Sequence, residues 1–597
     1  MAIGKISTTW EKDLVPLIKN LWLHINSSRR KQAIVLVILM IISSFAEVVS
    51  IGALLPFLEV LSNPEKVFSY DIVKDFAIIL NINKPDQLLF PITIMFIFAS
   101  VFAGAMRIFL IWYQTKLGYA IGADLSFKIF RNSLYQPYLT HVNRNSAELI
   151  TAISSKTNYV VGGIVMPALI LTSSIFMFFA IISLLVFLNP LLMIISITIF
   201  ASIYTIIAIL AKKQIAKNGA RINQEHTNVI KILQEGLGGI REVIINNMQG
   251  MYCSLYRSAD IPMRQAMATN QILAQIPRYA IEAIGVTLIA VVAYSLSLKS
   301  NDFNSFVPIL GVMALGAQRL LPIMQQAYGA WASAKGAQAI LKDSLVLLNQ
   351  KIINDDDDIQ KINFRKKIQL KDVNFYYGDN NECVLKNINL SIFKGERIGI
   401  IGETGGGKST LIDIIMGLLP LDSGSLVVDD VTVTNTNVRG WQSHIAHVPQ
   451  AIFLADTSIA KNIAFGVNSE NLDYKKVKYV AQQSQISDTV NSFKDGYETL
   501  VGERGVRLSG GERQRIGIAR ALYKASDVIV FDEATSSLDG ATEKEITNAI
   551  DSLGSEITTI IVAHRVSTLK RCDKIFEISN KGVRDIGSYS EMIKDLT

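Results

Sequence analysis

An eight-residue run rich in glycine has the composition of a loop that binds phosphate groups. It extends from Gly402 to Ser409 and has two glycines separated by four residues, followed by Lys408. The apolar run 397–401 ahead of it predicts a buried strand, and the run 410–415 behind it predicts a helix. Glycine lets backbone N–H groups curl around a phosphate, the helix N-terminus favours negative charge, and Lys408 neutralises phosphate oxygens. This context favours a nucleotide site over a simple glycine-rich turn.

Groups suited to nucleotide hydrolysis follow later in the chain. The apolar run 528–531 predicts a strand that ends in two carboxylates. Asp532 is suited to hold Mg²⁺ through its water shell, and Glu533 is suited to polarise an attacking water as general base. Gln450 offers an amide that can ligate the metal and sense the γ-phosphate, and His564 can donate a hydrogen bond to that phosphate.

Two more features complete this set. The segment Ser509-Gly510-Gly511-Glu512 presents a hydroxyl and bare backbone at a predicted helix N-terminus, which makes a second anion-binding surface. Tyr377 follows a β-like stretch and is placed to stack on adenine.

From about residue 368 to residue 597 the sequence resembles the nucleotide-binding domain of ABC transporters. Six motifs occur in the family's order and approximate spacing: the Walker A loop, the Q-loop, the LSGGQ motif, the Walker B strand, the D-loop at 536–539 and the H-loop. The segment 499–505 resembles the extra loop of ABC exporters. One position departs from the pattern, because the LSGGQ motif ends in Glu512 where Gln is commoner. Hydrolysis is still expected.

In that family ATP lies between the Walker A loop of one domain and the LSGGQ motif of another. Because this chain has one copy of each, the resemblance implies a homodimer with two composite sites. It implies ATP and Mg²⁺ as cofactors, with the metal at Ser409, Gln450 and Asp532. The catalytic residues would be Glu533, His564, Lys408 and Gln450. The ATP-binding residues would be Tyr377, Gly402, Glu403, Thr404, Gly405, Gly406, Gly407, Lys408, Ser409, Thr410 and Gln450, with Ser509, Gly510, Gly511 and Glu512 from the partner chain.

The composition indicates a membrane protein. Half of the 597 residues are hydrophobic, and the mean hydropathy is +0.32. The net charge of +7 is explained by Lys and Arg in loops assigned to the cytoplasm, and no aromatic–basic pattern favours nucleic acid. The three cysteines share no metal-like spacing, so reduced thiols are expected. Residues 1–30 predict an amphipathic helix on the cytoplasmic surface rather than a cleavable signal peptide.

Six apolar stretches are long enough to cross a bilayer. They lie at 32–61, 88–112, 160–188, 191–211, 278–298 and 306–328. Spans three and four are joined by a tight turn at Asn189-Pro190, and spans five and six by the short segment 299–305. The loops after spans two and four are long and basic, which assigns them to the cytoplasm. Turns near 142–147 and 235–241 are predicted to be coupling helices that press on the ATPase domain.

We therefore predict a multi-domain membrane protein. An all-α transmembrane domain of six helices with the type IV (type I) ABC exporter fold precedes an α/β P-loop nucleotide-binding domain, the plan of ABC exporter half-transporters. The predicted boundaries are 1–30 for the interfacial helix, 31–345 for the transmembrane domain with its two coupling loops, 346–366 for an acidic linker and 367–597 for the ATPase domain. For the aspartate run 354–358 a solvated linker is favoured over a metal site.

Charged residues within the spans bear on what is moved, because such charges need a partner or a function. Arg107, Arg278 and Arg319 lie in spans two, five and six, and Glu47 and Glu282 lie in spans one and five. The arginines either pair with these glutamates and lock the bundle, or line a surface for an anionic head group such as a pyrophosphate. Arg278 has the further alternative of reaching to the membrane interface.

An external segment at 71–80 predicts a short amphipathic helix that either touches a lipid tail or covers the bundle. This helix and the segments 45–47, 275–285 and 318–322 resemble bacterial lipid-linked oligosaccharide flippases of the PglK type. The resemblance implies a polyprenyl-diphosphate-linked oligosaccharide that is moved from the cytoplasmic to the outer face, with the three arginines near the diphosphate.

These features are compatible with three functions. The favoured one is an ATP-driven flippase or exporter of a lipid-linked oligosaccharide or similar anionic glycolipid. It would be a multi-pass homodimer of the cytoplasmic membrane, in contact with membrane lipid, with its ATPase domain in the cytosol. The alternative is an ABC exporter of peptides or hydrophobic drugs, which would not need the arginines. A soluble ABC ATPase acting on DNA or ribosomes is disfavoured by the six spans.

Overall fold

The computed structural model of the chain divides by its contacts into two compact units. One comprises Met1–Gln136 and Arg144–Lys351, and the other comprises Pro137–Asn143 and Ile352–Thr597. The short segment Pro137–Asn143 therefore belongs to the second unit, although in sequence it interrupts the first. The residues that the structure describes are 13–62, 64–70, 73–75, 82, 84–188, 190–297, 303–350, 352, 360–377, 382–533, 547–548, 550, 554–563 and 565–596.

Several predicted features lie outside these described residues. They are His564, the D-loop at 536–539, the aspartate run 354–358, Asn189 of the tight turn, the start of the joint at 299–305, most of the external segment 71–80 and residues 1–12.

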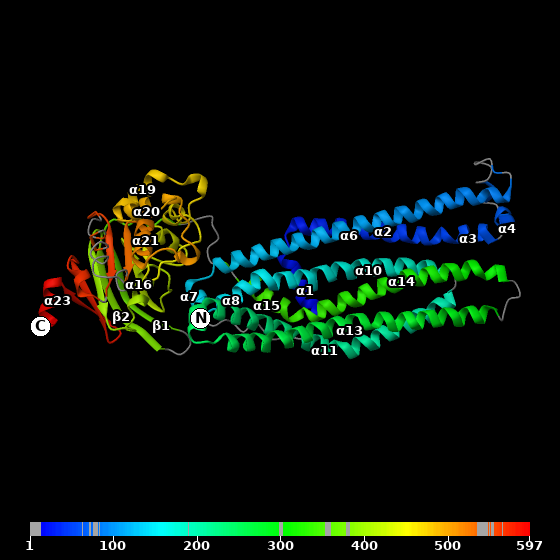
Figure 1. Cartoon of the computed structure of the whole chain (residues 1–597), viewed down its shortest axis with the longest axis horizontal. Coiled ribbons are helices and arrows are strands. Elements are labelled where there is room, and N and C mark those ends of the chain that lie inside the picture. The colour runs from blue at the N-terminus through cyan, green and yellow to red at the C-terminus, as the bar shows by residue number, and fades with distance from the viewer. Residues whose placement is uncertain are drawn as a thin grey trace. The chain divides into compact units, whose positions relative to one another are not determined.

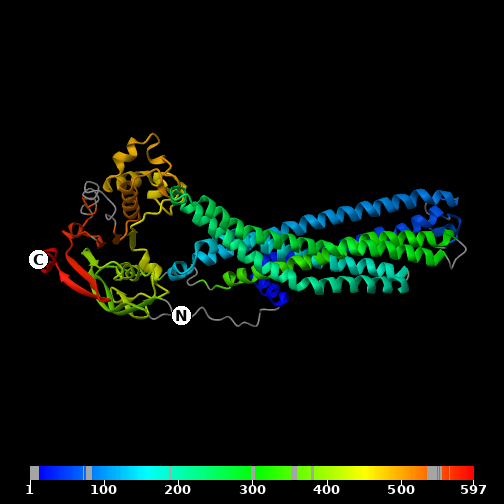
Figure 2. The same ribbon diagram turned by 60° about the horizontal axis from the view of Figure 1, so that its bottom comes forward.

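The first unit is built from long helices that run side by side (Figures 1 and 2). The longest in the described chain are α2 (Ser27–Gly52), α6 (Leu89–Leu134), α10 (Met166–Leu188), α11 (Pro190–Gly238), α13 (Gln249–Ser297) and α14 (Phe303–Gly336). Shorter elements precede or join them: α1 (Leu14–His24), α3 (Leu54–Ser62), α4 (Pro64–Phe68), η2 (Pro85–Leu88), α8 (Ser146–Thr151), η3 (Ala152–Lys156), α9 (Thr157–Val160), η4 (Val161–Val165), α12 (Ile240–Ile245) and α15 (Gln338–Leu348).

The predicted spans coincide with these long helices. Three described stretches are long and apolar enough to cross a membrane by length and composition: Ser27–Leu61, Pro85–Leu134 and Ser146–Leu184. They overlap the first three predicted spans, and the last three fall in α11, α13 and α14. Helices α6, α11 and α13 contain 46, 49 and 49 residues. Since about 20 residues cross a bilayer, each continues well beyond its apolar part.

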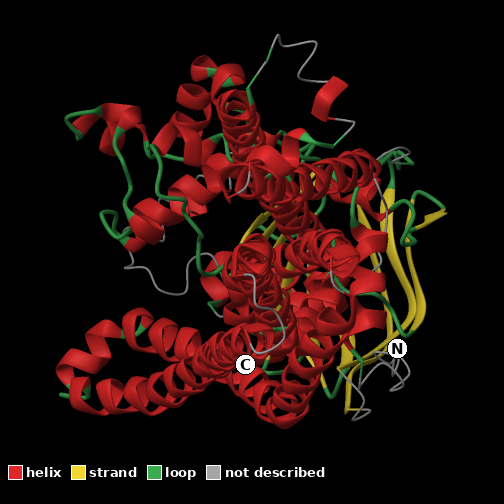
Figure 3. Cartoon of the chain, turned by 90° about the vertical axis from the view of Figure 1, so that its right-hand side faces the viewer, coloured by secondary structure: helices red, strands yellow, loops and turns green. Residues whose placement is uncertain are grey.

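The strands of the described chain, yellow in Figure 3, all belong to the second unit by their residue numbers. An antiparallel sheet has the order β2-β1-β4-β5, formed by β1 (Lys367–Tyr377), β2 (Glu382–Phe393), β4 (Ser423–Val428) and β5 (Val431–Thr432). A six-stranded sheet has the order β10-β9-β3-β8-β7-β6, formed by β3 (Arg397–Gly402), β6 (Ile445–Val448), β7 (Val528–Asp532), β8 (Thr558–Val562), β9 (Lys574–Ser579) and β10 (Gly582–Gly587). Its strands are parallel except for β10 at one edge.

Helices pack on these sheets around a buried core. Helix α16 (Lys408–Ile415) contributes Leu411, Ile412, Ile414 and Ile415 to the cluster that also contains the inward side chains of β1, β2 and β3. The remaining helices are α7 (Tyr138–Val142), α17 (Val438–Gln442), α18 (Ile459–Ile463), α19 (Tyr474–Gln483), α20 (Ser487–Ser492), α21 (Gly510–Lys524) and α23 (Tyr589–Leu596), with short turns η5 (Ser469–Asn471), η6 (Gly496–Glu498), η7 (Glu503–Gly505) and η8 (Val566–Leu569). The central strands are apolar over nearly their whole length because both faces are covered.

Candidate active site

Three parallel strands bring the predicted catalytic residues to one edge of the six-stranded sheet. Strand β8 lies between β3 and β7, and all three run in the same direction. Because parallel strands end at the same edge of a sheet, the phosphate loop after β3 and the carboxylates at the end of β7 emerge next to each other, where ligands bind in open α/β sheets.

The phosphate loop adopts a conformation that requires glycine at its ends. Gly402 has a φ of +147°, and a Cβ there would lie 2.4 Å from the carbonyl oxygen of Ile578 on β9. Gly407 has a φ of +100° and is the N-cap of α16. Other residues are strained at such φ values. The loop therefore leads directly into the N-terminus of α16, where unpaired N–H groups favour a phosphate.

Lys408 is held inside the loop that precedes it. Its side chain is buried, and its ammonium donates hydrogen bonds to the carbonyl oxygens of Gly402 at 2.8 Å and Glu403 at 2.9 Å. The next residue, Ser409, is exposed at the first turn of α16. A fixed positive charge and an exposed hydroxyl thus lie together at the helix N-terminus, as a nucleotide's terminal phosphates with a cation require.

The carboxylate Glu533 lies within hydrogen-bond distance of the predicted Q-loop amide. Gln450 Nε2 donates to Glu533 Oε2 at 2.7 Å. The backbone N–H of Glu533 donates to the carbonyl of Val562, which fixes this carboxylate at the end of the sheet. Gln514 on α21 in turn donates to the carbonyl oxygen of Gln450 at 2.9 Å. The general base and the metal-sensing amide proposed from sequence are therefore one hydrogen-bonded pair.

The LSGGQ-like segment forms the N-terminus of α21. Ser509 is the N-cap, and its hydroxyl accepts from the backbone N–H of Glu512 at 3.3 Å. The Glu512 carboxylate accepts from the backbone N–H of Ser509 at 2.7 Å, so the two residues make a reciprocal capping box. The departure from the family pattern thus has a structural role: Glu at this position satisfies a helix-terminal N–H group. Gly510 has open space where a Cβ would be.

Tyr377 lies at the end of β1 next to the phosphate-loop helix. Its hydroxyl is 3.3 Å from the hydroxyl of Thr410, and its ring packs edge-on against Phe375 with 4.9 Å between centroids. The ring remains partly exposed, as stacking on a base requires.

Two site neighbours were not predicted. Asp413 on α16 has its pKa raised to about 6, first by burial and then by the negative charge of Asp532. Tyr138 on α7 has its pKa raised by burial and by the charges of Asp413 and Tyr377, and its neighbour Leu139 packs against the core of the second unit. A short helix between two predicted spans therefore packs against the core of the second unit near α16. It ends at the start of the turn 142–147, which the sequence predicts to be a coupling helix, although the particular residues in contact carry no local signal.

The described residues fit a nucleotide and a divalent cation. Ser409, Gln450 and Asp532 supply hydroxyl, amide and carboxylate oxygens, the ligand types that hard cations prefer. Lys408 and the α16 N-terminus supply the positive potential for phosphate.

The arginines of the predicted spans have three different surroundings. Arg319 on α14 forms an ion pair with Glu47 on α2, with 3.0 Å between Nη1 and Oε1, and Glu47 is buried. The guanidinium of Arg278 lies over the ring of Tyr279 at 5.7 Å. Arg107 on α6 lines a cavity of about 260 Å³, and among the described residues no carboxylate pairs with it.

Comparisons with known proteins match the membrane part and the nucleotide-binding part of the chain separately. A family model described as ABC transporter matches residues 385–536, and one described as ABC transporter transmembrane region matches residues 32–315, so the two together match more than half of the chain. The chain belongs to the ABC transporters. With one transmembrane region and one ATPase domain it is a half-transporter of the exporter type, as predicted from its motifs.

The solved structure of a bacterial Atm1-family ABC exporter with ATP bound covers 96% of this ABC transporter, and 97% of that chain is matched, with a TM-score of 0.77 and 20% sequence identity. This likeness confirms the predicted fold. An ATP-dependent lipid A-core flippase of Saccharophagus degradans is 27% identical over 504 residues, which is 83% of each chain. The heavy metal tolerance protein of Schizosaccharomyces pombe is 40% identical over 228 residues, 38% of this chain and 27% of that protein.

These findings establish that the protein is a membrane transporter and that its ATP-binding domain is an ATPase coupled to transport. The roles of the individual site residues, the predicted domain boundaries and the resemblance to oligosaccharide flippases stay predictions.

Proposed function

We propose that this ABC transporter is an ATP-driven flippase that moves a lipid-linked oligosaccharide, such as a polyprenyl-diphosphate glycan, or a similar anionic glycolipid across the cytoplasmic membrane. Relatives that match more than four fifths of the chain are named as ATP-dependent lipid A-core flippases, which supports a lipid substrate. The chain's own residues support an anionic head group.

The surroundings of Arg107 are the main support for an anionic substrate. It lies within a predicted span, borders a cavity, and has no carboxylate partner among the residues described. Gln114, Thr115, Ser173 and Ser174 line the same cavity. A cation in an apolar layer needs a counter-charge or a polar ligand, and a guanidinium binds phosphate oxygens through paired hydrogen bonds. Arg319 needs no such ligand because Glu47 neutralises it.

We further propose that two copies of the chain form a homodimer with the ATPase domains in the cytosol. One copy would supply Lys408, Ser409 and the α16 N-terminus, and its partner would supply Ser509 and the α21 N-terminus. Both helix ends carry unpaired N–H groups and partial positive charge, so two such ends on opposite sides of a triphosphate balance its charge.

Within each site the residues divide the work of hydrolysis. Lys408 binds phosphate oxygens, and Ser409, Gln450 and Asp532 would hold Mg²⁺, which neutralises charge on the phosphates when it is bound. Glu533 accepts a proton from the attacking water, and Gln450, hydrogen-bonded to it at 2.7 Å, orients its carboxylate. Helix α7, packed beside α16, gives the membrane helices a mechanical connection to this site.

Reconstitution tests the proposal directly. The wild-type protein in liposomes should translocate a fluorescent polyprenyl-diphosphate glycan in an ATP-dependent manner, measured by protection of the fluorophore from an external quencher. Arg107→Gln should lower the initial rate by about tenfold or more, because a charge-assisted contact to phosphate is lost, whereas Arg107→Lys should keep part of the rate.

Absence of ATP-dependent translocation by the wild type would contradict the proposal. Equal rates for Arg107→Gln and the wild type would remove the argument for an anionic head group. The controls are Glu533→Gln, which should abolish translocation, and the double variant Glu47→Gln/Arg319→Gln. This double variant removes an ion pair without leaving a lone charge, so it should translocate nearly normally.

One observation favours the alternative, an exporter of peptides or hydrophobic drugs. A cavity of about 350 Å³ is lined mainly by apolar and aromatic side chains, among them Phe178, Tyr204, Tyr328 and Trp331. Such a wall suits an apolar molecule as well as a lipid chain. For a drug exporter, Arg107→Gln would leave transport unchanged, so the same variants separate the two functions.

A further inference from the structure

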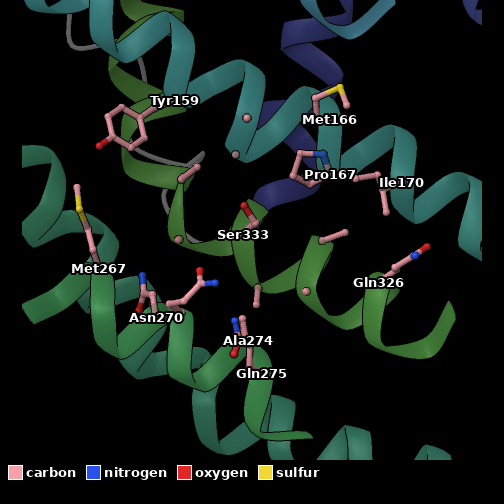
Figure 4. Close-up of a pocket in the computed structure, with 18 of the residues that line it drawn as sticks. Tyr159, Met166, Pro167, Ile170, Met267, Asn270, Ala274, Gln275, Gln326 and Ser333 are labelled. Carbon is pink, nitrogen blue, oxygen red and sulfur yellow. The ribbon is translucent and has the colours of Figure 1, made fainter. Parts of the chain in front are cut away.

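One cavity of the first unit is lined by apolar side chains and by polar but uncharged ones. It has a volume of about 860 Å³, within the range of ligand sites. Its walls come from α9, η4, α10, α11, α13, α14 and α15. In Figure 4, Tyr159 and Met166 lie across the cavity from Asn270 and Gln275.

Carboxamides dominate the polar part of this wall, and we name the space the amide cavity. The amides are those of Asn158, Asn270, Gln271, Gln275, Gln325 and Gln326. All residues that line it are described, and none of them is charged. Gln271, Gln275 and Gln326 are exposed and make no side-chain hydrogen bond to any described residue, so their donors and acceptors are available to a ligand.

A buried amide behind the wall orients one of these amides. Asn218 on α11 is buried, and its Nδ2 donates to Asn270 Oδ1 at 2.9 Å. Gln214 donates to Asn218 Oδ1 at 3.0 Å. Because the oxygen of Asn270 is already bonded, its amide nitrogen keeps its N–H groups for another acceptor. A buried amide that positions a second amide at a cavity wall is characteristic of a built binding site.

The wall is also unusual in its backbone. Two π-helical turns, η3 and η4, flank α9, which carries Asn158 and Tyr159. Such turns are rare and occur frequently at functional sites. Gly162 in η4 lines the cavity, and a Cβ at this position would meet no atom within 4 Å. The space beside Gly162 is therefore open to a ligand.

We propose that the amide cavity binds the glycan part of the lipid-linked substrate and discriminates between glycan-bearing and bare lipids. This inference rests on the proposed function and assigns the sugar to residues distinct from Arg107. Its ligand class follows from the lining: a carboxamide offers a donor and an acceptor together, and hydroxyl groups require both. The absence of charge from the lining disfavours a phosphate or a cation, and the number of amides disfavours a purely apolar molecule.

The position of the amide cavity along the helices agrees with this role. It lies at the start of predicted span three, just before span five and at the end of span six. In the predicted topology all three ends face the cytoplasm. Met166, Ile170 and Gln326 also line the cavity that contains Arg107, so the two spaces adjoin. A diphosphate at Arg107 and a glycan in the amide cavity would be neighbouring parts of one ligand.

The test compares two probe lipids in liposomes: polyprenyl diphosphate carrying an uncharged oligosaccharide, and bare polyprenyl diphosphate. Binding to the full-length protein is measured by competition with a fluorescent lipid, together with lipid-stimulated ATPase activity. The wild type should bind the glycan-bearing lipid about tenfold more tightly than the bare lipid, since several hydrogen bonds are added.

Two variants should remove this preference while leaving binding of the bare lipid unchanged. Gly162→Leu fills the cavity without a clash at its Cβ, and Gln271→Met removes an exposed amide with little change in shape. The matched control for the first is Gly104→Leu on α6, where a Cβ also meets nothing within 4 Å but the residue lies outside the amide cavity. The control should keep the full preference.

The outcomes distinguish a glycan site from a role of these residues in the fold and from failure of the proposed function. Retention of the preference by Gly162→Leu and Gln271→Met overturns the glycan site while the proposed function stands. Loss of binding of both lipids in Gln271→Met but not in Gly104→Leu also overturns it, because the amide would then serve the fold. If the wild type responds to neither lipid, the proposed function fails and this inference fails with it. A photoreactive group on the terminal sugar should label peptides from α9 or α13, and labelling elsewhere only would contradict the assignment.

Discussion

Glu533 combines a carboxylate with a left-handed backbone conformation at the edge of the ATPase sheet. Its φ is +49°, a value that few residues other than glycine, asparagine and aspartate adopt. Strain of this kind is tolerated where the surrounding structure fixes the residue, and it is concentrated at functional sites. The hydrogen bonds to Val562 and Gln450 supply that constraint.

Glu533→Gln should trap ATP and reduce its turnover by about a hundredfold to ten-thousandfold, the contribution of a general base. The fold should be retained, because a glutamine oxygen can still accept the hydrogen bond from Gln450. Steady-state phosphate release and the amount of retained nucleotide measure the two effects. Glu470→Gln, an exposed carboxylate in η5, is the control. Near-normal turnover in Glu533→Gln would contradict the assignment.

Glu512 places a negative charge at a helix end that is proposed to bind phosphate. Glu512→Gln keeps the capping hydrogen bond but removes the charge, so the α21 N-terminus should attract an anion more strongly. We expect the KM for ATP to fall by about twofold to fivefold, and the free energy of unfolding to drop by roughly 0.5 kcal/mol as the favourable helix-dipole contact is lost. ATPase kinetics and thermal unfolding measure these changes, and a higher KM would contradict the argument.

At the scale of elements, the sequence predicts those whose signals are local. Strands β3 and β7 nearly coincide with the predicted runs 397–401 and 528–531, because a short apolar run rich in β-branched residues has few other interpretations. The helix N-terminus at Ser509 was predicted, but its capping box was not, although Ser509 and Glu512 have the spacing that this motif requires.

Contacts between distant segments had no such local signal. The ion pair of Arg319 depends on α2 packing against α14, and the sequence offered Glu47 and Glu282 as equal partners. The contact of α7 with the phosphate-loop helix joins residues far apart in the chain. The amides of the amide cavity likewise come from three separate helices, and single Asn and Gln residues along one helix ordinarily indicate only a polar face.

The turn between β4 and β5 gives an element-scale prediction for pH. Asp429 accepts hydrogen bonds from the backbone N–H groups of Arg365, Lys366 and Lys367. Burial alone would raise the pKa of Asp429, but these N–H groups and the charge of Lys366 lower it below its usual value of 3.8. A lowered pKa means that the carboxylate stabilises the fold above the unfolded pKa and loses this effect as pH falls through the folded value.

Asp429→Asn should therefore lower the free energy of unfolding by about 1 kcal/mol, the scale of a partly exposed charged hydrogen bond. The loss should be constant from about pH 5 to pH 8 and should shrink below about pH 4. Thermal unfolding of the full-length protein across this range measures it. The control is Asp430→Asn, because Asp430 is an exposed neighbour that, like Asp429, has a positive φ, here +69°. A loss that grows toward acidic pH would show that the carboxylate does not act through its charge.

At the scale of the whole molecule, the chain carries one phosphate loop and one LSGGQ-like segment, both in the second unit. In the proposed homodimer, the N-terminus of α21 would meet the phosphate loop of the partner copy. The proposed homodimer thus joins the residue-scale chemistry to the oligomeric state, because each shared site would need one helix end from each chain.

Mixed dimers distinguish a shared site from a site within one chain. A dimer of one Lys408→Ala copy and one Gly510→Asp copy, isolated with two affinity tags, would have one intact site if each site is shared. Its other site would carry both changes. It should then trap about half as much nucleotide as the wild-type dimer, and as much as a dimer of one wild-type and one Lys408→Ala copy. Gly510→Asp is suitable because a Cβ there meets no atom within 4 Å. If each site lies within a single chain, the mixed dimer has no intact site, and trapping that falls to the level of the two parent variants would contradict the homodimer.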